Sequence, residues 1–367
     1  MQIPPSTADR ASARTRRRFL RDLAWGLGGG VLAGVGAAGP AMAGRAGATA
    51  STAGTDGSTA SPGVPDRRIV VTTPTGTLGA QVLHHLLAAP VRVRVVARDP
   101  DRLPAEVRAR AEIVVGSHGD AAVIAQACEG ADAVFWLCPP DPQASSVASA
   151  YVDFARPAAA AFARYRVPRV VGISALGRGT PLAAEAGFVT GSLAMDDLIA
   201  ASGVHFRALV MPSFMDNIAR QAPAIRERGV FFGPIPGDVA MPAVASRDIA
   251  GVAASLLLAA DWTGQREQPV LGPEDLSFDA MAAIASEVLG RPVRYVHTTY
   301  EAYRDGFVQR GMSAAMAQGM ADMARAKAGG LDNAVARTRD NRTPTTFRTW
   351  CLDTLRPLVD GDSRQAT

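Results

Sequence analysis

The chain of 367 residues is 48% hydrophobic and carries a formal net charge of +4. This length suffices for one large hydrophobic core with a smaller lobe beside it. The whole excess of positive charge lies in residues 1–43, which hold six arginines and two aspartates. The remainder is therefore near neutral and has no basic block, so the sequence excludes nucleic acid as a partner.

The first 43 residues have the pattern of a removable export signal. Residues 15–21, TRRRFLR, form a twin-arginine motif, and a weakly apolar stretch leads from them to an A-x-A cleavage site ending at Ala43. Seven glycines between Gly26 and Gly39 leave this stretch short of the ~20 apolar residues that a membrane span requires. A basic arm that binds nucleic acid is the poorer alternative, because the apolar stretch follows the arginines at once. We therefore predict export by the twin-arginine machinery to the periplasm or the outside, cleavage after Ala43 and no stable membrane span.

Residues 44–66 are rich in glycine, alanine, serine and threonine, a composition typical of flexible linkers. Strand and helix patterns alternate in the chain that follows. Strands are predicted at residues 69–71, 91–97, 111–115, 133–137, 167–173 and 204–210, and helices at residues 78–87, 121–128, 144–165 and 191–201. This alternation predicts an α/β fold with a doubly wound parallel sheet, whose ligand lies along the carboxyl ends of the strands.

The turn after the first strand is where we expect a dinucleotide. Its small residues would let the backbone N–H groups of a helix N-terminus approach a pyrophosphate. The predicted cofactor-binding residues of this turn are Thr73, Thr75, Gly76, Thr77, Leu78 and Gly79. Thr73 stands where the usual fingerprint has its first glycine. A tight turn with close helix–strand packing would use the same two glycines, so that alternative stays open.

The ends of the following strands indicate which dinucleotide is bound. Arg98 follows the second strand, where an NAD site commonly has an acidic residue, and a guanidinium suits a 2′-phosphate. NADP is therefore favoured and NAD is the alternative, since Arg98 is also one of 37 arginines and has Asp99 beside it. Cys138 and Pro139 after the fourth strand, and Ser174 after the fifth, are predicted cofactor walls, although such residues are also common in ordinary loops.

Cysteine and histidine spacing predicts neither a disulfide nor a metal site. Cys128 and Cys138 flank the fourth strand and should lie at opposite edges of the sheet. These two cysteines and Cys351 are therefore predicted to be buried thiols. The five histidines show no metal-ligand spacing.

The sequence also excludes one common mechanism of carbonyl reduction. Ordinary short-chain dehydrogenases use a tyrosine acid whose pKa is lowered by a lysine four residues later. The only lysine of this chain is Lys327, and residue 323 is methionine, so no Tyr-x-x-x-Lys pair exists. Asp196 and Asp197 lie on a predicted helix near the expected site, and we expect them to face solvent or an arginine.

Two segments after the sixth strand could form a substrate pocket. Phe214 and Asn217 leave that strand above the cofactor site, although Asn217 also suits a helix N-cap. Phe231 and Phe232 open an apolar, turn-rich loop that would either cover a flat substrate or pack the two lobes together. Four methionines at helical spacing, Met312, Met316, Met320 and Met323, are predicted core rather than binding surface.

Several segments, in their order along the chain, resemble the NmrA-like group of atypical short-chain dehydrogenases. They are ARDPDRL at 97–103, DAVFWLCPP at 132–140, RVVGISALG at 169–177, SRDIAGV at 246–252, VLGPEDLSFDAMAAIASEVLGRPVRYV at 270–296 and TPTTFRTW at 343–350. The resemblance implies an NAD(P)-binding Rossmann domain with a small C-terminal α/β substrate lobe. Carried onto this sequence, residues 75–78 would hold the pyrophosphate and Arg98 the ribose phosphate, while Phe214 and Asn217 would face the nicotinamide.

The predicted domains are a Rossmann domain at 67–212 and 239–271, a substrate lobe at 213–238 and 272–355, and a tail at 356–367. Members of the resembling group include quinone and azo-dye reductases and also regulators that bind dinucleotide without turnover. We predict an NAD(P)H-dependent oxidoreductase that passes hydride to an electron-poor small-molecule acceptor without a Tyr/Lys pair. The alternative is a non-catalytic NAD(P)-binding sensor, and the sequence assigns no catalytic residue and no oligomeric state.

Overall fold

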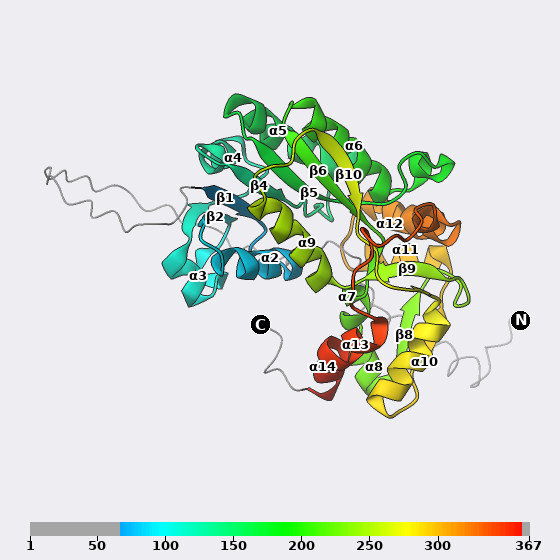
Figure 1. Cartoon of the computed structure of the whole chain (residues 1–367). Helices are drawn as coiled ribbons and strands as arrows, with labels where there is room; N and C mark the ends of the chain where they lie inside the picture. The colour runs from blue at the N-terminus through cyan, green and yellow to red at the C-terminus, as the bar shows by residue number, and fades with distance from the viewer. Residues whose placement is uncertain (1–66, 362–367) are drawn as a thin grey trace, which may run out of the picture.

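The computed structural model of the chain describes residues 67–361 (Figure 1). The predicted export signal, the predicted linker and residues 362–367 of the predicted tail lie outside the described residues. The first residues of the predicted tail, at 356–360, form helix α14 (Arg356–Asp360). Val359 of this helix is buried in the core of the smaller lobe.

The larger lobe is built on a seven-stranded sheet in which all neighbouring strands are parallel. The strands are β1 (Arg68–Thr72), β2 (Arg92–Ala97), β3 (Glu112–Val115), β4 (Ala133–Trp136), β5 (Arg169–Ala175), β6 (His205–Met211) and β10 (Gln265–Pro269). Their order is β10-β6-β5-β4-β1-β2-β3. The chain adds β2 and β3 on one side of β1 and then β4, β5, β6 and β10 on the other, so the switch point of the sheet lies between β1 and β4. The predicted doubly wound α/β fold is confirmed, and the six predicted strands lie within two residues of the observed bounds.

Helices cover both faces of this sheet (Figure 1). On one face lie α2 (Thr77–Leu87), α3 (Ala105–Arg110) and α9 (Ser246–Leu258), and on the other lie α4 (Ala121–Cys128), α5 (Phe154–Arg164) and α6 (Phe188–Ala201). Alternate residues of each strand point into the two hydrophobic cores, one on each face of the sheet. Val70 packs with the second group of helices, while Ile69 and Val71 pack with the first. The helix predicted at 144–165 is observed at 147–164, and its first half includes a π-helical turn, η2 (Ser149–Asp153), that runs directly into α5.

The smaller lobe contains two short sheets. One joins β7 (Ser213–Phe214), β9 (Met241–Val244) and β11 (Asp275–Leu276), and the other pairs β8 (Val230–Gly233) with β12 (Arg294–His297). The helices here are α7 (Asp216–Ala219), α8 (Ala222–Arg228), α10 (Phe278–Leu289), α11 (Tyr300–Gln309), α12 (Ala314–Ala328) and α13 (Phe347–Trp350). The segment 239–271 is divided between the lobes, since β9 pairs within the smaller one while α9 and β10 belong to the large sheet.

None of the helices in residues 67–361 is both long and apolar enough to cross a membrane. Cys128, Cys138 and Cys351 are buried free thiols, as predicted. Burial raises the pKa of Cys128 and Cys351 to about 12 and that of Cys138 further, so these thiols stay protonated and unreactive.

The turn between β1 and α2 depends on one very close approach of backbone to helix. The N–H of Gly76 donates to the carbonyl oxygen of Thr73 over 3.0 Å, and α2 begins at the next residue. A Cβ placed on Gly79 would lie 2.1 Å from the same carbonyl oxygen, so only glycine fits there. Thr73 itself has a φ of 53°, a left-handed conformation that costs a non-glycine residue about 1–2 kcal/mol.

We expect Gly79→Ala to lower the free energy of unfolding by about 2–3 kcal/mol, because the new methyl group must displace the Thr73 backbone. The matched control is Gly251→Ala within α9, where a Cβ meets no atom within 4 Å and alanine should stabilise the helix by up to ~1 kcal/mol. Urea unfolding of the two variants measures both changes. Equal stabilities would show that the turn does not require glycine at position 79.

Candidate functional site

The start of α2 presents backbone N–H groups at the carboxyl edge of the sheet. Gly76 is the N-cap, no side chain caps the helix, and the first turn has no acidic residue. The free amides and the positive end of the helix dipole therefore suit an anion such as a pyrophosphate. Thr75 and Thr77 are exposed at this point, whereas Leu78 and Gly79 are buried and offer only their backbone.

Arg98 lies at the same edge, directly after β2. It is exposed and close to His118, which follows β3. Burial is the main cause that lowers the pKa of His118 to about 4, the hydrogen bond to the Leu137 carbonyl opposes it, and the charge of Arg98 lowers it further. His118 is therefore neutral at pH 7. Arg98 is exposed beside it, and the shape of a guanidinium suits a phosphate.

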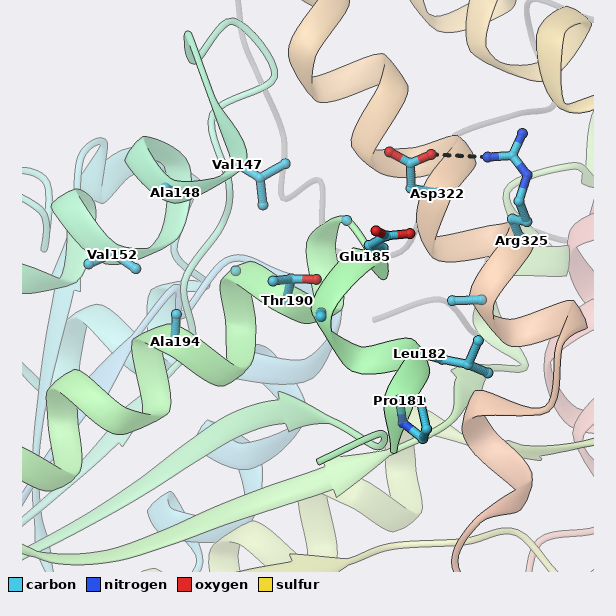
Figure 2. A pocket seen from close by; sticks show the side chains of 14 residues that line it. Val147, Ala148, Val152, Pro181, Leu182, Glu185, Thr190, Ala194, Asp322 and Arg325 are labelled. Atoms are coloured by element: carbon cyan, nitrogen blue, oxygen red, sulfur yellow. Dashed lines mark hydrogen bonds and ion pairs between the residues drawn. The ribbon is translucent and has the colours of Figure 1, made fainter. Parts of the chain in front are cut away.

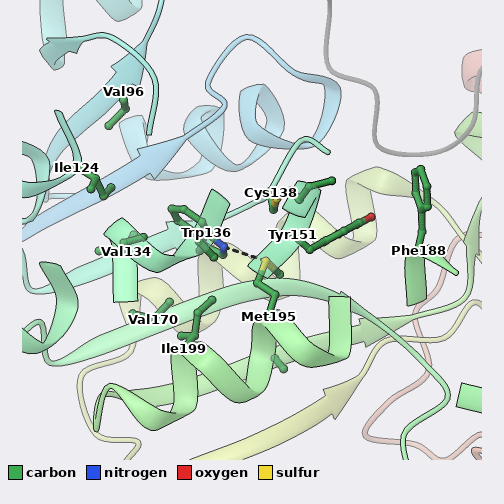
Figure 3. Close-up of a cluster of buried hydrophobic side chains, with 14 of the residues drawn as sticks. Val96, Ile124, Val134, Trp136, Cys138, Tyr151, Val170, Phe188, Met195 and Ile199 are labelled. Atoms are coloured by element: carbon green, nitrogen blue, oxygen red, sulfur yellow. Dashed lines mark hydrogen bonds between the residues drawn. The ribbon is translucent and has the colours of Figure 1, made fainter. Parts of the chain in front are cut away.

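His118 was not predicted as a site residue, although it lies against the end of β4 beside the predicted cofactor walls. Its ring packs edge-on against Trp136 and Phe154, with centroids 5.2 Å and 5.0 Å away. Cys138 was predicted as a cofactor wall, but its side chain lies in the core (Figure 3). There its thiol donates to the Ala150 carbonyl over 3.3 Å. Pro139 is half-buried and is the more accessible of the two predicted residues.

Ser174 belongs to a buried polar cluster that the sequence analysis did not predict. The hydroxyl of Ser174 is 3.1 Å from that of Ser192 on α6 and donates to the Oδ2 atom of Asp196 on the same helix. Asp197 pairs with Arg178 over 2.9 Å, as expected. The expectation for Asp196 was wrong, because it is only 3% exposed. It lies four residues after Ser192 on the inner stripe of α6, whereas Asp197 is turned about 100° away from it.

The Asp196 carboxyl is unusual for a buried group. Its Oδ1 atom has no hydrogen-bond partner. Burial raises the pKa of Asp196 to about 8, the bond from Ser174 and the charge of Arg178 lower it, and the carboxylates of Glu267 and Asp197 raise it. At neutral pH the Asp196 carboxyl therefore holds a proton.

A cavity of about 120 Å³ lies beside the end of β6. All four predicted pocket residues, Phe214, Asn217, Phe231 and Phe232, line it together. The two phenylalanines of the expected loop are instead in strand β8 and are at most 3% exposed, so they form a fixed wall rather than a cover. β8 pairs with β12, which turns an apolar stretch that was predicted as a loop into a strand.

The opposite wall of this cavity comes from α12. Met320 and Met323 line it, and Met312, Met316 and Met320 are also buried in the large core, as predicted. Lys327 lines the cavity too, with its Nζ atom 2.5 Å from the carboxylate of Asp332. The space is therefore mainly apolar, with a few polar groups that could orient a small molecule.

The polar side chains that line the cavity differ in whether their atoms have hydrogen-bond partners. The side chain of Gln221 bonds both the N–H and the C=O of Phe232, over 2.8 Å and 3.0 Å, so both of its ends are used. The Oδ1 atom of Asn217 is buried and has no partner. Asn217 therefore has an acceptor available to a bound molecule, and Gln221 has none.

A larger groove of about 590 Å³ runs along the outer face of α6 (Figure 2). It lies between η2, α12 and the short helix η3 (Pro181–Glu185), and its rim holds the ion pair of Asp322 and Arg325. No predicted site residue lines it. Within residues 67–361, no group of three His, Cys, Asp or Glu side chains could hold a metal ion.

Residues 74–259 match the family described as NAD(P)H-binding. Over 247 residues the chain is 34% identical to a (4-alkanoyl-5-oxo-2,5-dihydrofuran-3-yl)methyl phosphate reductase of Streptomyces griseus, covering 66% of this chain and 81% of that protein. It is 29% identical over 256 residues to an NAD(P)H azoreductase of Xenophilus azovorans, covering 70% and 85%.

Two solved structures share the fold. One is an NADPH-dependent quinone oxidoreductase of Escherichia coli complexed with NADPH, with a TM-score of 0.60 and 20% identity over 80% of this chain and 98% of that one. The other is the triphenylmethane reductase of Citrobacter sp. complexed with NADP(H), with a TM-score of 0.62 and 18% identity over 80% and 99%. At such identities the likeness carries the architecture and not the chemistry.

The raised pKa of Asp196 predicts a specific dependence of stability on pH. The folded state binds this proton more tightly than the unfolded state, so its contribution is complete below about pH 4 and is lost as the pH rises through about 8. The free energy of unfolding of Asp196→Asn should rise relative to that of the wild type across this range, by up to ~1.4 kcal/mol per pH unit. Urea unfolding at several pH values measures the difference. Asp197→Asn is the control and should show no such trend, and parallel profiles for Asp196→Asn and wild type would contradict the raised pKa.

Proposed function

Since this chain belongs to the NAD(P)H-binding family, in the NmrA-like class of atypical short-chain dehydrogenases, we propose that it is a reductase that transfers hydride from NADPH to an electron-poor, flat acceptor such as a quinone or an azo compound. The observation that carries the proposal is the apolar cavity beside β6, which holds the unpartnered amide oxygen of Asn217. In our proposal this cavity is on the nicotinamide side of a bound dinucleotide.

The sheet order supports that placement. In a doubly wound sheet a dinucleotide crosses the carboxyl edge at the switch point, with its adenosine over one half of the strands and its nicotinamide over the other. Here the switch point lies between β1 and β4. Arg98 would meet the adenosine phosphate beside β2, and Phe214 and Asn217 would line the acceptor cavity on the nicotinamide side beside β6. When bound, the cofactor supplies the hydride.

The protein's own residues would position the acceptor. Phe231 and Phe232 form a rigid apolar wall for a flat ring, and Asn217 offers one acceptor atom to orient it. Holding two reactants in the correct orientation can replace a large part of the entropic barrier. Electron-poor acceptors suit such a site, because they take hydride without strong acid activation.

The two similar sequences support this class of reaction. Their names describe a reductase of a (4-alkanoyl-5-oxo-2,5-dihydrofuran-3-yl)methyl phosphate and an NAD(P)H azoreductase. The cofactor NADPH is proposed over NADH because Arg98 provides a cation where a 2′-phosphate would lie.

A non-catalytic dinucleotide sensor is the second candidate. It is favoured by Thr73, which adopts a strained left-handed conformation at the usual position of a glycine. It is also favoured by the lack of a Tyr-x-x-x-Lys pair in the sequence. Turnover with an acceptor distinguishes the two candidates.

We also propose that residues 1–43 direct export through the twin-arginine machinery, which transports folded proteins. The support is the twin-arginine motif followed by an apolar stretch and the A-x-A site at 41–43. Cell fractionation should find the mature protein outside the cytoplasm, and replacement of Arg16 and Arg17 by lysine should retain it inside. Wild-type protein found in the cytoplasm at full length would refute the proposal.

Arg98→Glu should weaken NADPH binding about tenfold or more and leave NADH binding nearly unchanged, because only NADPH has the 2′-phosphate. Calorimetric titration of both cofactors measures this difference. Arg102→Glu makes the same change of charge in the same exposed loop and serves as the control. Equal losses for the two cofactors would place the phosphate elsewhere.

Wild-type protein should oxidise NADPH in the presence of at least one member of a panel of quinones, azo dyes and enones. Asn217→Ala should lower kcat/KM for that acceptor about tenfold or more while the Kd for NADPH stays the same, because the lost oxygen orients only the acceptor. The absorbance of NADPH measures its oxidation by the wild type and by Asn217→Ala. Tight NADPH binding without oxidation by any acceptor would favour the sensor instead.

A further inference from the structure

The polar side chains of the cavity beside β6 determine which acceptors fit it. We propose that this cavity binds one aromatic ring of the acceptor through a neutral hydroxyl group on that ring. The hydroxyl group donates a hydrogen bond to the Oδ1 atom of Asn217 and accepts one from the hydroxyl of Tyr303. The inference rests on the proposed reductase function, and it makes Tyr303 a residue that determines specificity.

The size of the cavity limits what enters it. Its volume is about 120 Å³. An apolar protein cavity of about 150 Å³ holds benzene. One six-membered ring therefore fits, whereas a whole dye molecule does not. Ser213 and Phe214 line the cavity directly after β6, so the rest of a larger acceptor would extend from the ring toward the carboxyl edge of the sheet.

Most of the polar groups around the cavity are already used or lie toward the sheet. The polar side chains that line it are those of Ser213, Asn217, Gln221, Tyr303 and Lys327. Both ends of the Gln221 side chain bond the backbone of Phe232, and the Lys327 ammonium pairs with Asp332. Ser213 begins β7 and lies at the end of the cavity nearest the large sheet. Asn217 and Tyr303 are therefore the groups that an entering ring meets.

Tyr303 offers a hydroxyl proton at the cavity wall. This half-buried residue of α11 packs edge-on against Phe307, with ring centroids 4.9 Å apart, and among residues 67–361 its hydroxyl has no hydrogen-bond partner. The hydroxyl of Tyr295 donates to the carbonyl oxygen of Ile235, a residue of the cavity wall, over 2.6 Å. Burial is the main cause that raises the pKa of Tyr295, and the nearby Tyr303 raises it further, so the two hydroxyls are neighbours. The Tyr303 hydroxyl thus reaches the same wall with its proton available.

Asn217 offers the complementary atom. Its Oδ1 atom is buried and has no partner. Asn217 is on α7 and Tyr303 on α11, so two separate elements bring an acceptor and a donor to one cavity. A hydroxyl group has one proton to donate and lone pairs that accept. One hydroxyl on a bound ring therefore satisfies both residues.

The charges of the cavity favour a neutral group over an anionic one. Among the residues that line it only Lys327 is charged, and its Nζ atom is 2.5 Å from the carboxylate of Asp332, which is fully buried. The pair has no net charge, so a sulfonate or carboxylate on the ring would lose its hydration without gaining a counter-ion. A phenol, with an ordinary pKa of about 10, is neutral at pH 7 and keeps its proton for Asn217.

Three small rings of nearly equal size test the site without turnover. Phenol both donates and accepts, aniline donates but accepts poorly, and toluene does neither. Calorimetric titration of the full-length protein at pH 7 measures their Kd. Asn217→Leu should weaken the binding of phenol and of aniline about tenfold, because their donor loses its partner. Tyr303→Phe should weaken phenol about tenfold and leave aniline nearly unchanged.

Tyr300→Phe is the matched control. Tyr300 is three residues earlier on α11, does not line the cavity and lies under the guanidinium of Arg325, 4.7 Å from its ring centroid. This variant should leave all three Kd values unchanged. Toluene should bind the wild type and every variant equally, which shows that the cavity is intact. Phenol binding that neither Asn217→Leu nor Tyr303→Phe weakens would overturn the proposal.

Reduction of 4-hydroxyazobenzene and 4-methylazobenzene by NADPH connects the site to the reaction. The ratio of kcat/KM for the hydroxy compound to that for the methyl compound should fall about tenfold in Asn217→Leu and in Tyr303→Phe, and not in Tyr300→Phe. If both compounds are reduced and this ratio is the same in all variants, the hydroxyl site is wrong and the reductase function stands. If the rings bind as expected but no acceptor oxidises NADPH, the hydroxyl site is supported and the reductase function fails.

Discussion

The side chain of Thr72 fixes the point at which the sheet opens for a ligand. β1 and β4 pair in parallel as far as Val71 and Phe135, and beyond them the chain leaves the two strands in opposite directions. At this end the Thr72 hydroxyl donates to the Phe135 carbonyl and accepts from the Leu137 N–H, both over 3.0 Å. The two strand ends are therefore locked together immediately before the turn that would hold a pyrophosphate.

This lock explains how a strained residue is tolerated in the turn. Thr73 is held on one side by the fixed end of β1 and on the other by Gly79, which brings the start of α2 against its carbonyl. The surrounding packing stabilises a conformation that costs the isolated residue about 1–2 kcal/mol. The N–H groups at the start of α2 are thereby fixed at the switch point without a side-chain cap.

The sequence predicts those parts of the fold in which a run of apolar residues indicates a buried element. The β-branched runs of β1, β2 and β5 are buried between two layers of helices, so their apolar character identifies them. β10 was not predicted, because its sequence QREQP lies at the edge of the sheet and none of its five residues is buried. β8 was predicted as a loop for another reason, since Phe231 and Phe232 precede a glycine and two prolines that are typical of a loop.

The site was predicted unevenly for a similar reason. Spacing after a strand identifies residues such as Arg98 and Phe214, which chain order alone brings to the carboxyl edge. The contact between Ser174 and Asp196 joins β5 to the inner stripe of α6, and only the rotation of that helix about its axis decides that Asp196 is buried and Asp197 is not. Two adjacent aspartates carry no signal in the sequence that separates them.

The inner stripe of α6 carries a buried acid at a position where other proteins of this fold can carry a Tyr/Lys pair. The stripe carries Phe188, Ser192 and Asp196 at successive four-residue intervals, which is the spacing that a tyrosine followed by a lysine would need. A lysine would lower the pKa of a tyrosine toward neutrality through its positive charge. Without a cation on the stripe, burial raises the pKa of a carboxylic acid toward neutrality instead. The Asp196 carboxyl therefore holds a proton at pH 7 because the apolar core around it, rather than a neighbouring charge, has the largest effect on its pKa.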